Sequence, residues 1–201
     1  MNPLQYRHSI LKVMSVGGIP ATWNPNDKAA NISLSDGNLT TTRSGAGPAS
    51  VRATVGKNSG KHYFEIKCIS SSFTFDVWVG FSNKVANLVS LPGQSSADGN
   101  AWAIALDGGD YYHNGFIAAA SSTWPAAVDD VFGFAWNADG SNISLYRQNV
   151  LLTPTPLFTG MGGLLYPIIT TQSNTTVMTA NFGATNMTYT APTGYIQGLY
   201  S

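Results

Sequence analysis

The chain has 201 residues, and its 10 Lys and Arg residues balance 10 Asp and Glu residues, so the formal net charge is zero. Charged residues make up 10% of the chain, against roughly 25% in an ordinary soluble domain, whereas hydrophobic residues make up 43%. This composition favours one globular domain with a sizeable core and offers little electrostatic basis for nucleic-acid binding. We expect no membrane-spanning helix, because no apolar run is long enough, and no secretory signal at the start of the chain. The single cysteine, Cys68, cannot form an internal disulfide.

Apolar residues recur at every second position in several short segments, which is typical of half-buried strands. In residues 62–69, Phe64, Ile66 and Cys68 share one face, and polar side chains occupy much of the other. Similar patterns predict strands over residues 77–81, 101–106, 131–136, 143–146, 164–171 and 176–182. Gly, Asn and Asp turns separate these segments, which favours an all-β sandwich or barrel with few or no helices. Residues 4–14 are compatible with a short helix or with an extended arm.

Several motifs resemble those of the SPRY (B30.2-like) family. Residues 59–66, Ser-Gly-Lys-His-Tyr-Phe-Glu-Ile, resemble the family's G-x-x-Y-x-E strand. Further matches follow in the family's order: Trp78-Val79-Gly80-Phe81, Ala101-Trp102, Tyr111-Tyr112-His113-Asn114-Gly115, the strand at 130–137, Ile143-Ser144-Leu145-Tyr146, Leu165-Tyr166-Pro167, Asn181-Phe182-Gly183 and Pro192-Thr193-Gly194-Tyr195. The resemblance covers roughly residues 22–198 and implies a bent antiparallel β-sandwich, similar to concanavalin-like folds. We therefore expect an N-terminal arm over residues 1–20 and a SPRY-like domain over residues 21–201.

The resemblance also implies a binding module whose ligand contacts loops at one end of the sandwich. Carried over by position, these loops are residues 43–50, 70–74, 89–94 and 171–175. The candidate contact residues are Arg43, Ser72, Phe73, Leu91, Pro92, Gln172, Ser173 and Asn174. Exposed apolar side chains at Phe73 and Leu91 would suit a contact anchor, although Phe73 could instead cap the core. Trp124 is a ninth candidate, either as a stacking surface for a sugar or as a side chain folded onto its own sandwich.

The residues for enzymatic chemistry are sparse. A glycosidase needs paired carboxylates, but Glu65 is the only glutamate and its strand carries no second acid. Cys68 and His62 lie six residues apart on one strand, roughly 20 Å, so they cannot form a catalytic dyad. Asp107, Asp110 and His113 could meet around an ion, but ordinary turn chemistry explains them better. We expect no enzymatic activity, no cofactor and no metal.

The scarcity of charge and the abundance of Gly, Ser, Thr and Asn predict a bacteriophage virion protein, as a tail-fibre, receptor-binding or decoration component. Its partners would be other virion proteins, a host-surface glycan or a host-surface protein, with no nucleic acid and no membrane insertion. It would be made in the host cytoplasm and could form a homo-oligomer through residues 1–20. Two alternatives remain open: an intracellular SPRY adaptor that binds a short peptide, and a free-standing lectin-like protein.

Overall fold

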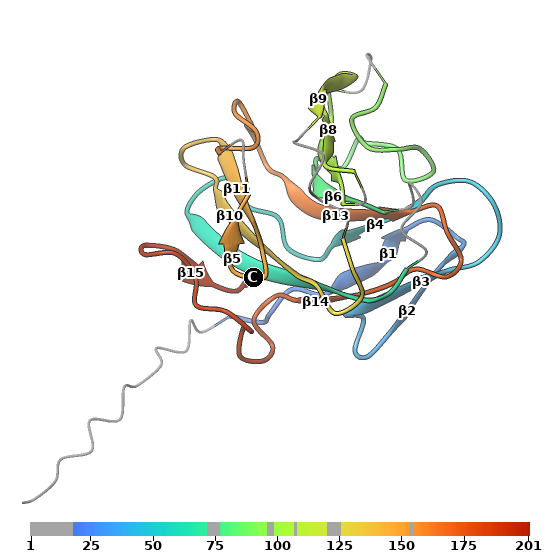
Figure 1. Ribbon diagram of the computed structural model, residues 1–201, viewed down its shortest axis with the longest axis horizontal. Coiled ribbons are helices and arrows are strands. Elements are labelled where there is room, and N and C mark those ends of the chain that lie inside the picture. Colours follow the sequence, from blue (N-terminus) through green and yellow to red (C-terminus); the bar gives the residue numbers. More distant parts are fainter. Residues whose placement is uncertain (1–17, 72–76, 96–98, 107, 120–125, 153–154) are drawn as a thin grey trace, which may run out of the picture.

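Two β-sheets packed face to face form the protein (Figure 1). The computed structural model describes residues 18–71, 77–95, 99–106, 108–119, 126–152 and 155–201. Fifteen strands and no helix are found in these residues. The predicted all-β sandwich is therefore confirmed, and each of the seven predicted strands coincides with an observed one to within about two residues.

The first sheet has seven antiparallel strands. Their spatial order is β1 (Trp23–Lys28), β4 (Ala49–Ala53), β13 (Tyr166–Thr171), β6 (Val77–Ser82), β7 (Ala101–Ala105), β8 (Asp110–Tyr112) and β9 (Phe116–Ala119). β1 and β9 are thus the two edges of this sheet. The sequence patterns predicted β6, β7 and β13, whereas β1, β4, β8 and β9 lack a simple alternation of apolar and polar residues.

The second sheet has eight strands. Seven of them follow the order β12 (Val150–Leu151), β11 (Asn142–Arg147), β10 (Val131–Asn137), β5 (Lys61–Ser70), β14 (Val177–Asn181), β3 (Thr40–Arg43) and β2 (Ile32–Ser35). The eighth, β15 (Ile196–Gln197), pairs in parallel with the start of β5. β5 is the longest strand and lies at the centre of this sheet, between β10 and β14.

Aromatic side chains fill the space between the sheets. Phe64 stacks on Phe134 with ring centroids 5.1 Å apart, and it also contacts Phe81 from the opposite sheet. Trp23 meets Phe182 edge to face at 5.0 Å. Such pairs add a geometric preference to the burial of apolar area, which is the main favourable term in folding. The inward face predicted for Phe64, Ile66 and Cys68 is confirmed, since all three are fully buried.

Part of the opposite face of β5 is also buried, which alternation alone did not predict. Tyr63 and Glu65 are 1% and 2% exposed. The Glu65 carboxylate accepts hydrogen bonds from the backbone amides of Thr188 and Tyr189, at 2.7 and 2.8 Å, and from the Tyr63 hydroxyl at 3.2 Å. Burial, and then the neighbouring Glu65, raise the pKa of Tyr63, so its hydroxyl keeps the proton that it donates. Glu65 therefore attaches the C-terminal segment to the outer face of the second sheet.

The two ends of the described chain also meet. Pro20 and Tyr200 form an antiparallel bridge, and the Ala21 amide donates to the Leu199 carbonyl at 2.7 Å. Figure 1 shows the C-terminus and β15 on one side of the molecule and the β8–β9 hairpin on another. The described chain therefore begins beside its own C-terminus.

We predict that Glu65→Ala lowers the free energy of unfolding by about 2–4 kcal/mol, because it removes the acceptor of two partly buried backbone amides and of the buried Tyr63 hydroxyl. Glu65→Gln should cost less, since its amide oxygen still accepts one hydrogen bond. Urea unfolding followed by tryptophan fluorescence measures both. Lys67→Ala is the matched control on the same strand: it removes only an exposed ion pair with Asp129 and should cost less than about 1 kcal/mol. Equal losses for Glu65→Ala and Lys67→Ala would contradict this role of Glu65.

Candidate functional site

Three connections between strands meet at one end of the sandwich, here called the loop end. They run from β3 to β4, from β5 to β6 and from β13 to β14. The strand register brings them together, because Thr171 pairs with both Ala49 and Val77, and Val177 pairs with Ser70. The described parts of the loops inferred from the family resemblance, residues 43–50, 70–71 and 171–175, therefore lie at the same end.

Arg43 is at the end of β3 and only 6% exposed. Its Nη1 donates to the backbone carbonyl of Gln172 and, at 3.0 Å, to Oδ1 of Asn174. The structure thus brings three of the predicted contact residues together. It places Arg43 beneath the β13–β14 loop rather than on the surface, so Arg43 supports the loop.

The β13–β14 loop is held by further hydrogen bonds. The Ser173 hydroxyl lies 2.8 Å from that of Thr175 and accepts from the Thr175 amide. Ser70 at the end of β5 donates its hydroxyl to the Thr175 carbonyl at 2.7 Å. Asn174 is exposed, and Gln172 and Ser173 are half-buried. The loop end therefore presents uncharged amide and hydroxyl groups on a backbone that is fixed to neighbouring strands.

Two polar atoms at the loop end are buried without a hydrogen-bond partner. They are Nε of Arg43 and Oγ1 of Thr171, the residue that precedes Gln172. A buried donor without an acceptor costs free energy, and native structures contain few of them. Five further such atoms lie in the rest of the described sandwich, so these two do not by themselves mark a ligand site.

Leu91 and Pro92 have a different position from the one expected. Residues 83–95 fold over the outer face of the seven-stranded sheet, where Leu91 packs on Trp78, Ala103 and Ala105. Pro92 is buried and Leu91 is half-buried, so both belong to the packing of this segment. The exposed apolar side chains here are Val85 and Val89, which the sequence did not single out.

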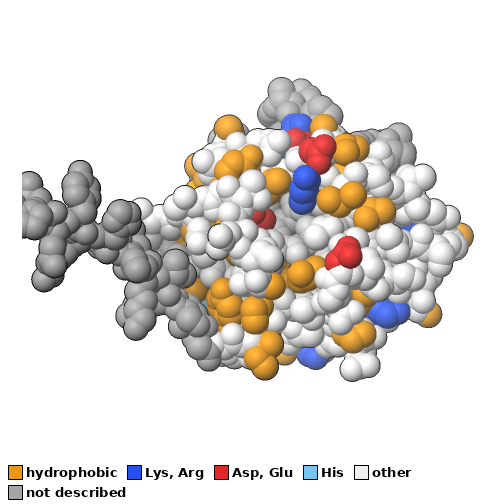
Figure 2. Space-filling view, turned by 90° about the horizontal axis from the view of Figure 1, so that it is seen from below, with side chains coloured by type: hydrophobic (Ala, Val, Ile, Leu, Met, Phe, Trp, Pro, Cys, Tyr) orange, Lys and Arg blue, Asp and Glu red, His pale blue; other side chains and the backbone are white. Residues whose placement is uncertain are grey.

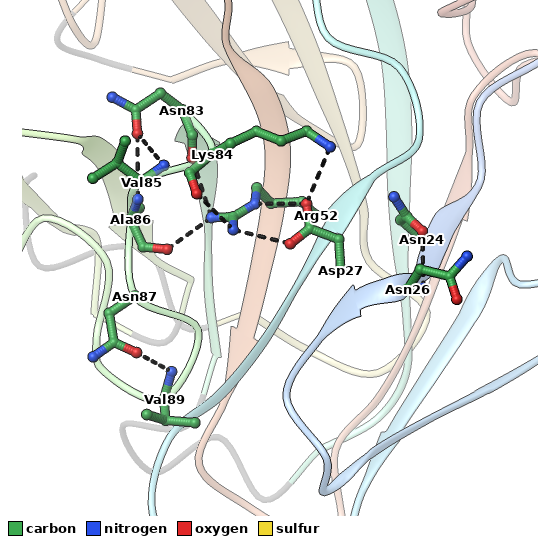
Figure 3. Close-up of polar contacts among 10 residues, drawn as sticks. All are labelled: Asn24, Asn26, Asp27, Arg52, Asn83, Lys84, Val85, Ala86, Asn87 and Val89. Atoms are coloured by element: carbon green, nitrogen blue, oxygen red, sulfur yellow. Dashed lines mark hydrogen bonds and ion pairs between the residues drawn. The ribbon is translucent and has the colours of Figure 1, made fainter.

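Arg52, which sequence reasoning missed, organises this outer face (Figure 3). It is 3% exposed, and its guanidinium makes two 3.0 Å hydrogen bonds to the Asp27 carboxylate. The same group donates to the backbone carbonyls of Asn83, Lys84 and Ala86 at 2.9–3.3 Å. A cation between apolar residues in the strand Ala-Ser-Val-Arg-Ala was the available signal, because a charge is buried only when it is paired.

Asp27 is the counter-charge of Arg52. Burial alone would raise the pKa of Asp27, but the hydrogen bonds and charge of Arg52, together with Lys84 at 3.6 Å, outweigh it and hold the pKa below its usual value. Asp27 is therefore ionised at neutral pH. It binds the Arg52 guanidinium from β1, and the backbone carbonyls of Asn83, Lys84 and Ala86 bind the same guanidinium from the loop.

The remaining candidates do not form a site in the described residues. Ser72, Phe73, Trp124 and Asp107 lie outside the residues that the structure describes. His113 stacks on Trp102 and directs Nδ1 to the Ala101 carbonyl at 2.9 Å. A group of three or more potential metal ligands is not found in the described part of the chain. The described residues contain no helix that could cross a membrane.

Solved structures of SPRY domains share this architecture. The SPRY domain of human HERC1 superposes with a TM-score of 0.67 at 16% identity, over 82% of this chain and 99% of that one. The chain has the SPRY fold. The PSpry domain of TRIM65 agrees, with a TM-score of 0.61 at 16% identity over 81% of this chain and 92% of that one. These identities are too low to show more than the fold.

Curated relatives share sequence with this SPRY-fold chain. Ran-binding protein 9 of Homo sapiens is 31% identical over 173 residues, which are 82% of this chain and 23% of the relative. Ran-binding protein 9 of Xenopus tropicalis is 31% identical over 172 residues, 82% of this chain and 30% of that protein. The chain thus spans less than a third of the length of these relatives. No family model matches the sequence.

These comparisons correct part of the prediction from composition. The relatives named above are animal proteins, and the bacteriophage context finds no support in them. They favour the alternative of an adaptor that binds a protein segment.

We predict that the Asp27–Arg52 pair stabilises the fold only while Asp27 is ionised. A carboxylate with a lowered folded-state pKa contributes stability above its unfolded pKa of about 3.9 and loses it as pH falls through the folded value. The difference in unfolding free energy between wild type and Asp27→Asn should therefore be largest near neutral pH and shrink below about pH 4. Urea unfolding at a series of pH values measures it. Asp36→Asn, in an exposed turn, should show a small difference at every pH. A wild-type to Asp27→Asn difference that does not change with pH would contradict the prediction.

Proposed function

We propose that this chain is a binding module without catalytic activity, and that its loop end holds a short, uncharged polar segment of a partner protein. The observation that carries the proposal is the β13–β14 loop, whose amide and hydroxyl groups lie on a backbone held from beneath by Arg43. A surface that is fixed before binding loses little conformational entropy when a ligand docks. The SPRY fold and the names of the relatives, which describe them as binding Ran, support a protein partner in general.

The groups at the loop end suit a peptide backbone and amide side chains. The amide NH₂ groups of Gln172 and Asn174 can donate to a ligand, whereas Oδ1 of Asn174 already accepts from Arg43 and the Ser173 hydroxyl already bonds Thr175. Because Arg43 already binds the loop, its charge is directed inward. Figure 2 shows that on one face of the molecule the few charged side chains lie scattered among hydrophobic and uncharged ones. Recognition would therefore depend on shape and neutral hydrogen bonds rather than on electrostatic attraction.

The test begins with selection from a library of random peptides displayed against the immobilised full chain. Affinities of the selected peptides are then measured by fluorescence polarisation. We expect Asn174→Ala to weaken binding about tenfold or more, because a contact worth about 1.4 kcal/mol is lost. Arg43→Met should weaken binding too, by releasing the loop.

Thr193→Ala is the matched control, an exposed residue of the C-terminal segment, and should bind like wild type. Salt provides a second test, because a neutral contact changes its affinity little, within about twofold, when ionic strength rises. Failure to select any peptide, or equal affinity of wild type, Asn174→Ala and Arg43→Met, would overturn the proposal.

A further inference from the structure

A cavity of about 260 Å³ opens between the edges of the two sheets, away from the loop end. One wall consists of Trp102, Tyr111, His113 and Ile117, from the β7–β9 side of the seven-stranded sheet. The other wall is the segment from Pro156 to Thr159, which is attached to the second sheet because the Leu157 amide donates to the Ile143 carbonyl at 2.7 Å. None of the lining residues is Lys, Arg, Asp or Glu. The cavity therefore suits an uncharged, apolar side chain.

The strand beside this cavity, β9, is an edge of its sheet, with no further strand paired to it among the described residues. It reads Phe-Ile-Ala-Ala, without a charge or a proline, and its pairing with β8 is irregular between Tyr111 and Tyr112. Phe116 is 61% exposed and contacts Tyr112, whereas Ile117 is 47% exposed and lines the cavity with Tyr111. Edge strands of natural proteins are usually guarded by charges, prolines or covering segments. An added strand could pair with β9 and place every second side chain beside Ile117, at the cavity.

The chain itself contains a segment with the required pattern. Residues 9–14 read Ser-Ile-Leu-Lys-Val-Met. In an extended conformation Leu11 and Val13 share one face, which would face the cavity, while Lys12 lies on the other and stays in solvent. The β-branched Ile10 and Val13 also favour a strand. Residues 9–14 thus supply two neighbouring apolar anchors and a cation that need not be buried.

The segment fits the β9 of a different copy of the chain better than its own β9. Gly18 lies beside Tyr200, five residues before β1, at the side of the molecule that carries β15 and the C-terminus, whereas Figure 1 shows the β8–β9 hairpin on another side. Val13 is five residues from Gly18 and can reach at most about 18 Å from it. Pairing with the β9 of a second copy does not require the segment to cross its own sandwich.

We propose that residues 9–14 of one copy pair with β9 of a second copy and insert Leu11 and Val13 into the cavity beside Ile117. Each copy has one such segment and one groove, so reciprocal exchange between two copies closes a symmetric pair. The backbone hydrogen bonds of an added strand supply affinity, and the cavity selects the apolar side chains. This inference does not depend on the loop end.

The test is the solution mass of the full chain by light scattering over a concentration series. We expect the wild type to have the mass of a pair. Val13→Asp and Ile117→Asp should each have the mass of a single chain, because each places a carboxylate in the apolar contact. Val13 precedes the described residues, whose core it does not line, so this variant separates loss of pairing from loss of folding. Val85→Asp, at an exposed apolar site on the residue 83–95 segment, and Asn174→Ala, at the loop end, should remain paired.

Mixing the two defective variants provides a further arm of the experiment. Val13→Asp keeps an intact groove, and Ile117→Asp keeps an intact segment, so together they should form a mixed pair with one exchanged segment. A wild type of single-chain mass at every concentration, or either variant remaining paired, would overturn the proposal. So would a mixture that stays at single-chain mass. Val13→Asp and Ile117→Asp should bind loop-end peptides like wild type. Loss of pairing without loss of peptide binding therefore separates a test of this proposal from a test of the proposed function.

Discussion

A buried charge in a protein must be neutralised where it lies, and this constraint determines how the outer face of the seven-stranded sheet is covered. Arg52 points away from the core, on a face that would otherwise be open to solvent. Its guanidinium takes both oxygens of Asp27 and three backbone carbonyls from residues 83–86. The planar fork of donors explains why an arginine can hold a strand and a loop simultaneously, which the point charge of a lysine could not do.

Glu65 and Arg43 repeat this arrangement with other segments. Glu65 receives two amides of the C-terminal segment on the second sheet, and Arg43 binds a carbonyl and an amide side chain of the β13–β14 loop. Each buried charge is thus satisfied largely by backbone groups from a connection that is distant in sequence. In a chain with so few charged residues, three of them determine where the long connections lie.

The difference between what the sequence could and could not predict follows from this arrangement. Period-two alternation identified β5, β6, β7, β10, β11, β13 and β14, because those strands bury one face in the common core. It could not show that Tyr63 and Glu65 on the other face are also buried, since the covering segment is more than 120 residues away. Leu91 and Arg43 were expected on the surface for the same reason: their burial depends on long-range packing that no local pattern records.

The loop end and the β9 edge make different physical demands on a partner. The loop end offers hydrogen-bonding groups on a held backbone, so it discriminates by the donors and acceptors that a ligand presents. The β9 edge offers strand backbone without a charge or a proline and an apolar cavity, so it discriminates by strand conformation and side-chain size. Because neither surface depends on strong charge, the association rate at both should lack long-range electrostatic steering and change little with salt. Specificity must then come from shape and from the cost of leaving polar groups unpaired, which requires surfaces that are already fixed before the partner arrives. The buried charges beneath the loops provide that rigidity.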